Sequence, residues 1–98
     1  MTMTKLEFLM DNREKILHIA ETHGAYNVRV FGSTARNEAD EKSDVDILVD
    51  LKPGRNLLDL GGLLMDLQDF LHCRVDVITE KTMKPRMRKT VLYEAIKL

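Results

Sequence analysis

Residues 30–49 read VFGSTARNEADEKSDVDILV, and this stretch decides both the expected fold and the expected chemistry. It holds the pair Gly32-Ser33 and, after ten intervening residues, the triplet Asp44-Val45-Asp46. Residues 28–31 predict a short strand that stops at Gly32. A short helix over 33–38, with Ser33 as its N-cap, is expected to follow, and then a polar loop over 37–43.

The residues around the triplet alternate in polarity with a period of two. Such alternation predicts a β-strand over 44–50, because successive side chains of a strand point to opposite faces. One face carries Val45, Ile47 and Val49, and the other carries Asp44, Asp46, Leu48 and Asp50.

Elsewhere in the chain, apolar residues recur at helical spacing. They predict an amphipathic helix over 4–22, opened by a capping box of Thr4 and Glu7, with Gly24 beyond its end. A second helix is predicted over 57–71, a third strand over 75–78, and a last helix from Pro85. The expected core stripes are Leu57, Leu60, Leu64, Leu67 and Leu71 on the second helix, and Met87, Val91 and Ala95 on the last. The fold class is therefore α/β of the α+β type, a small mixed three-stranded sheet packed with helices in the order α-β-(α)-β-α-β-α.

Length and composition limit the functions that the chain can have. The chain has 98 residues, 44% of them hydrophobic and 32% charged, with a formal net charge of −1. This is the size of one domain over 1–98, without room for a separate substrate domain. The near-zero charge and the scarce aromatics argue against direct nucleic-acid binding. Three aspartates within 57–71 exclude a membrane span there, and the lone Cys73 and the lack of an apolar leader predict a cytoplasmic protein.

The aspartates carry the expected chemistry. Asp44 and Asp46 project from one strand face, where two unpaired carboxylates repel each other and raise each other's pKa. A divalent cation removes that repulsion, and oxygen ligands favour Mg²⁺ or Mn²⁺. Asp76, near the start of the third strand, can converge with them if that strand runs parallel to the second and the first runs antiparallel. Gly32-Ser33 would then lie at the same edge, where glycine lets a phosphate approach the backbone.

The spacing Gly-Ser-x10-Asp-x-Asp resembles the signature of the DNA polymerase β-like nucleotidyltransferases. The sequence around it looks like the minimal nucleotidyltransferase branch, and so do residues 75–78 and 92–96. The resemblance implies a polymerase β-like fold and a metal-dependent transfer of AMP from ATP, with two metal ions. It implies that Asp44, Asp46 and Asp76 are the catalytic and metal-binding residues, and that Gly32, Ser33 and Arg36 bind the nucleotide.

Minimal members of that family often pair with a HEPN-domain protein. The resemblance therefore implies a hetero-oligomer in which this chain is the antitoxin and adenylylates a tyrosine of a HEPN ribonuclease toxin. Two alternatives stay open: a non-catalytic antitoxin with a vestigial nucleotide site, and transfer to a small molecule or an RNA end. The aspartates could also lie on a solvated strand face, and Arg36 could simply pair with nearby acids. A basic stretch of Lys81, Lys84, Arg86, Arg88 and Lys89 is either a solvated helix start or a contact for triphosphate, RNA or an acidic partner.

Overall fold

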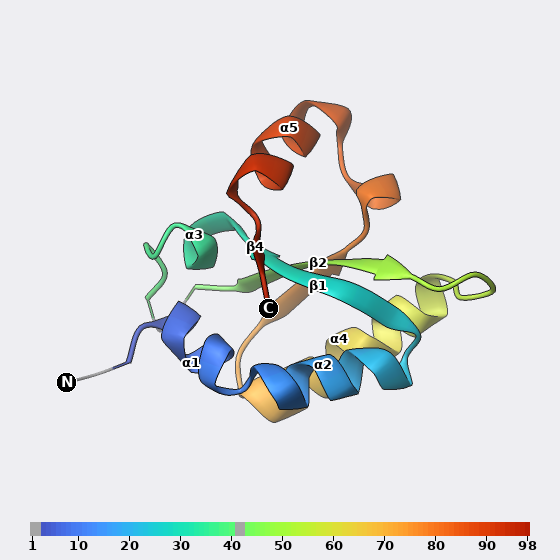
Figure 1. Ribbon diagram of the computed structural model, residues 1–98, viewed down its shortest axis with the longest axis horizontal. Helices are drawn as coiled ribbons and strands as arrows, with labels where there is room; N and C mark the ends of the chain where they lie inside the picture. Colours follow the sequence, from blue (N-terminus) through green and yellow to red (C-terminus); the bar gives the residue numbers. More distant parts are fainter. Residues whose placement is uncertain (1–2, 41–42) are drawn as a thin grey trace.

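A computed structural model describes residues 3–40 and 43–98 of the chain. Its strands form one mixed sheet in the order β3-β2-β1-β4 (Figure 1). The strands are β1 (Ala25–Phe31), β2 (Val45–Leu51), β3 (Val75–Ile78) and β4 (Ile96–Lys97). The helices are α1 (Lys5–Asp11), α2 (Arg13–Thr22), α3 (Gly32–Ala35), α4 (Leu57–Leu71), the 3-10 turn η1 (Glu80–Thr82) and α5 (Pro85–Glu94). Glu41, part of the expected polar loop, lies outside the described residues.

The strand directions are those that convergence of the acidic residues requires. β1 runs antiparallel to β2, and β2 runs parallel to β3, with α4 as the crossover between the parallel strands. The expected mixed sheet is thus confirmed, with one strand more than predicted. The additional strand β4 has two residues and pairs antiparallel with β1 at Arg29 and Val30.

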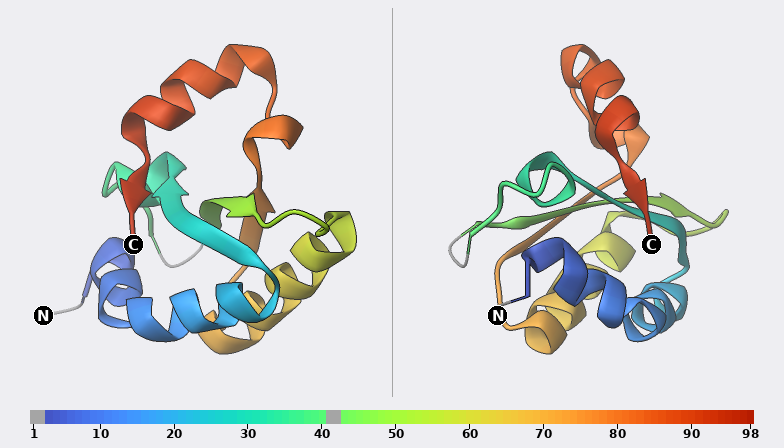
Figure 2. Two further views of the ribbon diagram at one scale, coloured as in Figure 1. Left: turned by 45° about the vertical axis from the view of Figure 1, so that its right-hand side comes forward. Right: turned by 60° about the vertical axis from the view of Figure 1, so that its left-hand side comes forward.

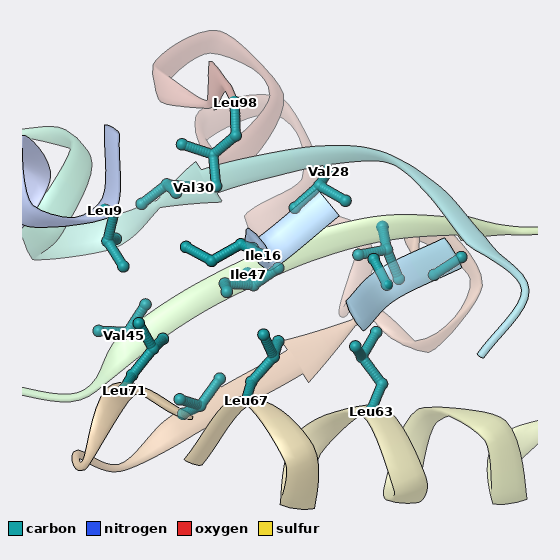
Figure 3. Packing of buried hydrophobic residues seen from close by; sticks show 14 of the residues in the cluster. Leu9, Ile16, Val28, Val30, Val45, Ile47, Leu63, Leu67, Leu71 and Leu98 are labelled. Atoms are coloured by element: carbon teal, nitrogen blue, oxygen red, sulfur yellow. The ribbon is translucent and has the colours of Figure 1, made fainter. Parts of the chain in front are cut away.

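The sheet is covered differently on its two faces. Helices α1, α2 and α4 lie on one side and α5 on the other (Figure 2). The first side holds the larger core, in which Leu63, Leu67 and Leu71 of α4 point toward the sheet and Leu71 lies beside Val45 of β2 (Figure 3). None of the helices in the described part of the chain combines the length and the apolar composition that a membrane-spanning segment requires.

A second, smaller core lies under α5. It consists of Phe31, Leu48, Met83 and Val91, and Leu48 is completely buried although it shares a strand face with the aspartates. The apolar side chains of this cluster therefore fix the position of α5 above the acidic face of the sheet.

The predicted helix over 4–22 is in fact two helices that meet at Asn12. The capping box of Thr4 and Glu7 is present, but the Asn12 side chain donates a 2.8 Å hydrogen bond to the carbonyl of Phe8. Asparagine competes in this way for backbone groups, and here it accompanies a non-helical conformation with φ −105° and ψ 13°.

Two core assignments were wrong. Leu57 is 69% exposed at the start of α4, where Leu63 is buried instead, and Met87 is 44% exposed on α5. Leu57 occupies the first position of its helix and is exposed there, a placement that periodicity alone does not reveal.

Candidate active site

The acidic residues lie where β1 ends and β2 and β3 begin. Asp46 is paired with Phe31 of β1 on one side and with Asp76 of β3 on the other. Asp44 immediately precedes β2, and both Asp44 and Asp76 are exposed. Since Gly32 follows Phe31, three strands bring together the predicted glycine turn and the predicted carboxylates.

Gly32 gives this edge its shape. Its φ of +72° is a left-handed conformation that glycine adopts without the penalty of a side chain. A Cβ atom at this position would collide with the carboxylate Oδ2 of Asp46. The turn can therefore lie directly against Asp46 only because residue 32 has no side chain.

Asp46 has an unusual electrostatic environment. Burial raises the pKa of the Asp46 carboxyl, and the charges of Asp76 and Asp44 raise it further, while Arg36 acts in the opposite direction. Asp44 and Asp76 are thus close enough to Asp46 for their charges to oppose its ionisation.

In the structure, Ser33 lies inside the short helix and is not its N-cap. The short helix begins at Gly32, and its N-cap is Phe31, which has no capping side chain, so the expected Ser33 cap is wrong. The N-cap therefore lies two residues before the expected position, and the helix opens at Gly32, which has a positive φ. Within the part of the chain that the structure describes, the Ser33 hydroxyl makes no hydrogen bond, and it stays available to a ligand.

Arg36 lies beside the turn and is held by two carboxylates. Its Nε donates to Glu38 at 3.0 Å, and its Nη1 donates to Glu94 at 2.9 Å. These two hydrogen bonds raise the pKa of the already basic guanidinium, that to Glu38 more than that to Glu94. Pairing with acids, the simpler alternative for Arg36, is therefore present in the structure.

Glu94 was not predicted as a site residue. It is the last residue of α5, and its Oε1 accepts a 3.0 Å hydrogen bond from the main-chain N–H of Gly32. A single acidic residue at the end of a helix carries no sequence signal of such a contact. Its position within 92–96, one of the segments that carried the family resemblance, was the one available hint.

A cavity of about 450 Å³ opens between the glycine turn and α5. Its walls include Gly32, Arg36 and Asp46 from the predicted set, together with Arg86, Met87, Thr90 and Glu94 of α5. Ser33, Asp44 and Asp76 do not line it. A larger hollow of about 570 Å³, at the other end of β2 around Asp50 and Arg55, contains none of the predicted site residues.

The donor set fits a divalent metal, although no finished metal cage is present. Within residues 3–40 and 43–98, no group of three or more acidic, histidine or cysteine side chains is arranged to hold an ion. Mg²⁺ takes oxygen ligands, and it is usually bound by one or two carboxylates together with substrate phosphates and water. Asp46, with the charges of Asp44 and Asp76 acting on it, would suit a site of that kind, in which substrate phosphates and water supply the remaining ligands.

The five basic residues of the stretch over 81–89 have different surroundings. All five side chains are exposed, but Arg88 pairs with Glu80 at 3.2 Å, and Arg86 lines the cavity beside Asp46. Arg86 is therefore the member of the stretch that lies closest to the predicted chemistry.

Comparison with known proteins agrees with this geometry. The family model of the nucleotidyltransferase domain matches residues 13–98. A protein of Methanocaldococcus jannaschii, provisionally named a protein adenylyltransferase, is 42% identical over 84 residues, which are 86% of this chain and 90% of that protein. The protein adenylyltransferase MntA of Thermococcus cleftensis is 38% identical over 96 residues, covering 98% of this chain and 95% of the other.

Solved structures agree as well. One protein, provisionally described as a minimal nucleotidyltransferase, superposes with a TM-score of 0.84 at 49% identity and 95% coverage of both chains. A toxin-antitoxin structure with AMP-PNP has a TM-score of 0.75 at 19% identity, covering 88% of this chain and 71% of its own, and this likeness concerns the fold alone. The chain therefore belongs to the nucleotidyltransferase domain family and is an adenylyltransferase enzyme of its minimal branch.

Proposed function

We propose that this enzyme transfers AMP from ATP to a tyrosine hydroxyl of a partner HEPN ribonuclease toxin and thereby acts as its antitoxin. The observation that carries the proposal is the position of Asp46, which pairs with Asp76 on one side and, on the other, with Phe31, the residue before Gly32. The relative named as the protein adenylyltransferase MntA, which spans almost the whole chain, supports a protein acceptor. The toxin-antitoxin structures named MntA-HpeT support a toxin as that acceptor, in a hetero-oligomer.

The reaction makes one bond and breaks one. The oxygen of the acceptor hydroxyl attacks the α-phosphorus of ATP, the bond from that phosphorus to the bridging oxygen breaks, and pyrophosphate leaves. The hydroxyl proton passes to a carboxylate, and we assign this role to Asp76, which is exposed and is paired with Asp46 across β2 and β3.

The remaining residues bind and orient the nucleotide. Gly32-Ser33 and Arg36 hold its phosphates, the serine through its uncommitted hydroxyl and the arginine through its guanidinium. Asp44, Asp46 and Asp76 would hold two Mg²⁺ ions, or Mn²⁺ in their place. Such ions, when bound, neutralise charge on the phosphate oxygens. The cavity below α5 is open to a partner, so a protein surface can supply the acceptor that this small domain cannot enclose.

A labelling experiment tests the proposal. The chain is incubated with α-labelled ATP, Mg²⁺ and the partner toxin, and we expect label on a tyrosine of the toxin and loss of its ribonuclease activity. The Asp44→Asn, Asp46→Asn double variant should transfer no label, whereas Asp69→Asn, an exposed change on α4, should label as the wild type does.

Other outcomes select the alternatives. Protection from the toxin by the double variant, without a mass change on the toxin, would mean that the chain acts as a non-catalytic antitoxin. Label that appears on a metabolite or an RNA end, without any partner protein, would overturn the protein acceptor.

A further inference from the structure

Glu94 joins the two walls of the candidate cavity. One wall is the turn after β1, and the other is α5, which contacts the turn through its last residue. The Glu94 side chain is only 16% exposed, and each of its two oxygens accepts a hydrogen bond. The contacts span 62 positions to Gly32 and 58 positions to Arg36 along the chain.

Neither β1 nor α3 supplies a hydrogen-bond acceptor for the main-chain N–H of Gly32. β1 ends at Phe31, so the strand ladder does not continue to this amide. The first N–H groups of a helix likewise lack an intrahelical acceptor. Glu94 supplies the missing acceptor, and a charged acceptor makes a stronger hydrogen bond than a neutral one.

Gly32 is therefore held from two sides. Its Cα faces the carboxylate of Asp46 so closely that no side chain fits between them, while its N–H is bound to Glu94. A change at either contact would alter the distance between the turn and Asp46.

Glu94 also orients Arg36 without using all its donors. A guanidinium has five N–H groups. Among the described residues, Arg36 donates through Nε to Glu38 and through Nη1 to Glu94, which leaves Nη2 for a ligand. Of the two carboxylates, Glu94 is the less exposed, at 16% against 63% for Glu38, and its ion pair is therefore the less screened by solvent.

We infer that Glu94 is a positioning residue, which fixes the Gly32 N–H and the Arg36 guanidinium beside Asp46 and so sets the affinity of the site for the phosphates of ATP. The inference rests on the proposed function, since it concerns the same nucleotide. The contrary relation would be competition, in which Glu94 occupies the groups that the phosphates need. Positioning predicts that removal of the Glu94 carboxylate weakens ATP binding, whereas competition predicts that its removal strengthens ATP binding.

The test is the dissociation constant of MgATP, measured by calorimetry on the whole chain. Glu94→Ala should weaken binding about tenfold or more, equivalent to roughly 1.4 kcal/mol. Glu94→Gln retains an acceptor for the Gly32 N–H but loses the ion pair, so its affinity should lie between those of Glu94→Ala and the wild type. The matched variant Glu38→Ala, which touches Arg36 but not Gly32, should lose less than Glu94→Ala, and the exposed Glu21→Gln should lose nothing.

A double-mutant cycle separates positioning from a general loss of structure. If Glu94 acts through Arg36, then Glu94→Ala should cost less affinity in an Arg36→Ala background than in the wild type. The main-chain amide signal of Gly32 in nitrogen-15 NMR spectra should also shift in Glu94→Ala without nucleotide, and not in Glu38→Ala.

Each contrary result has one meaning. Unchanged or tighter ATP binding by Glu94→Ala and Glu94→Gln overturns the positioning role alone. Strict additivity with Arg36→Ala overturns the part of that role that acts through Arg36. A wild-type chain that binds no MgATP overturns the proposed function and this inference together.

Discussion

Asp46 and Asp76 are direct neighbours in the parallel pairing of β2 and β3, although thirty residues separate them in the sequence. This pairing places two like charges side by side, and Asp76 is the largest charge effect on the raised pKa of Asp46. The protein thus keeps an electrostatically unfavourable pair at the edge of a well-packed sheet. Repulsion of this kind is what a bound cation would relieve.

Asp46→Asn should make the metal-free protein more stable at neutral pH. A carboxyl whose pKa is raised by folding destabilises the native state once it ionises, so this cost appears as pH rises above its ordinary value of 3.8. The variant should melt about 1 to 4 °C above the wild type at pH 7 in EDTA, and the difference should shrink toward about pH 3.5. Thermal scans across that range check this, and Mg²⁺ should raise the melting temperature of the wild type more than that of the variant.

Asp69→Asn is the control for that experiment, because it removes an exposed carboxylate of α4 away from the cluster. It should leave the pH profile of stability unchanged. A wild-type protein that is more stable than Asp46→Asn at pH 7 would contradict the argument.

Gly32→Ala should impair both folding and transfer. Alanine is strained at a φ of +72°, and its Cβ would displace the Asp46 carboxylate. We expect a loss of about 1 kcal/mol or more in the free energy of unfolding, together with loss of AMP transfer. Denaturant unfolding and the labelling assay measure the two effects.

The matched change Gly61→Ala should have the opposite sign. Gly61 lies inside α4, and a Cβ there would meet nothing within 4 Å. Helix propensity then predicts a gain of about 0.5 to 1 kcal/mol, with transfer unaffected. Equal effects of the two substitutions would show that the shape of the turn is unimportant.

Val91→Ala should loosen α5 and weaken ATP binding. Val91 is 3% exposed and packs in the small core with Leu48, which holds α5 over the cavity. Loss of two carbon atoms should cost about 2 kcal/mol of stability. Leu92→Ala, on the exposed side of the same helix, should cost less than about 0.5 kcal/mol and leave ATP affinity unchanged. Calorimetric titration and denaturant unfolding of both variants test the difference.

Asp59, at the start of α4, should affect the pH dependence of stability in the opposite direction from Asp46. Asp59 accepts a 2.9 Å hydrogen bond from the N–H of Asn56, and this bond, with help from Arg55, lowers the pKa of Asp59. A carboxyl whose pKa is lowered by folding stabilises the native protein at pH values above its ordinary pKa. This stabilisation is lost as the pH falls through the pKa of the carboxyl in the folded protein. Asp59→Asn should therefore destabilise the protein at neutral pH, with the difference disappearing in acid.

Asn56→Ala removes the other half of this capping box and should cost about 1 kcal/mol. Both substitutions lie at the far end of β2 from the acidic cluster, so they should leave the affinity for ATP unaltered. A change in ATP affinity in either variant would contradict that separation.

Strong periodic patterns and the acidic motif were visible in the sequence. The period of β2 and the stripe of α4 gave both elements to within a residue, because burial of one face dominates their energetics. The expected directions of β1, β2 and β3 followed from the need to bring Asp46, Asp76 and Gly32 to one edge. The roles assigned to those residues stay a prediction.

What the sequence concealed depends on long-range contacts. β4 has two residues and no period, and it forms because the free edge of β1 offers unpaired backbone groups. The break at Asn12 is accompanied by one side-chain hydrogen bond, and the contacts of Glu94 depend on the return of the chain to Gly32. None of these leaves a local pattern.

The two faces of strand β2 contribute to different parts of the molecule, the large core and the cavity. Val45, Ile47 and Val49 belong to the large core, whereas Asp46 faces the cavity under α5. Substitutions in the helical layer should therefore change the stability of the large core without altering the residues that line the cavity, whereas substitutions on the cavity side of α5 should alter the cavity and leave the large core intact.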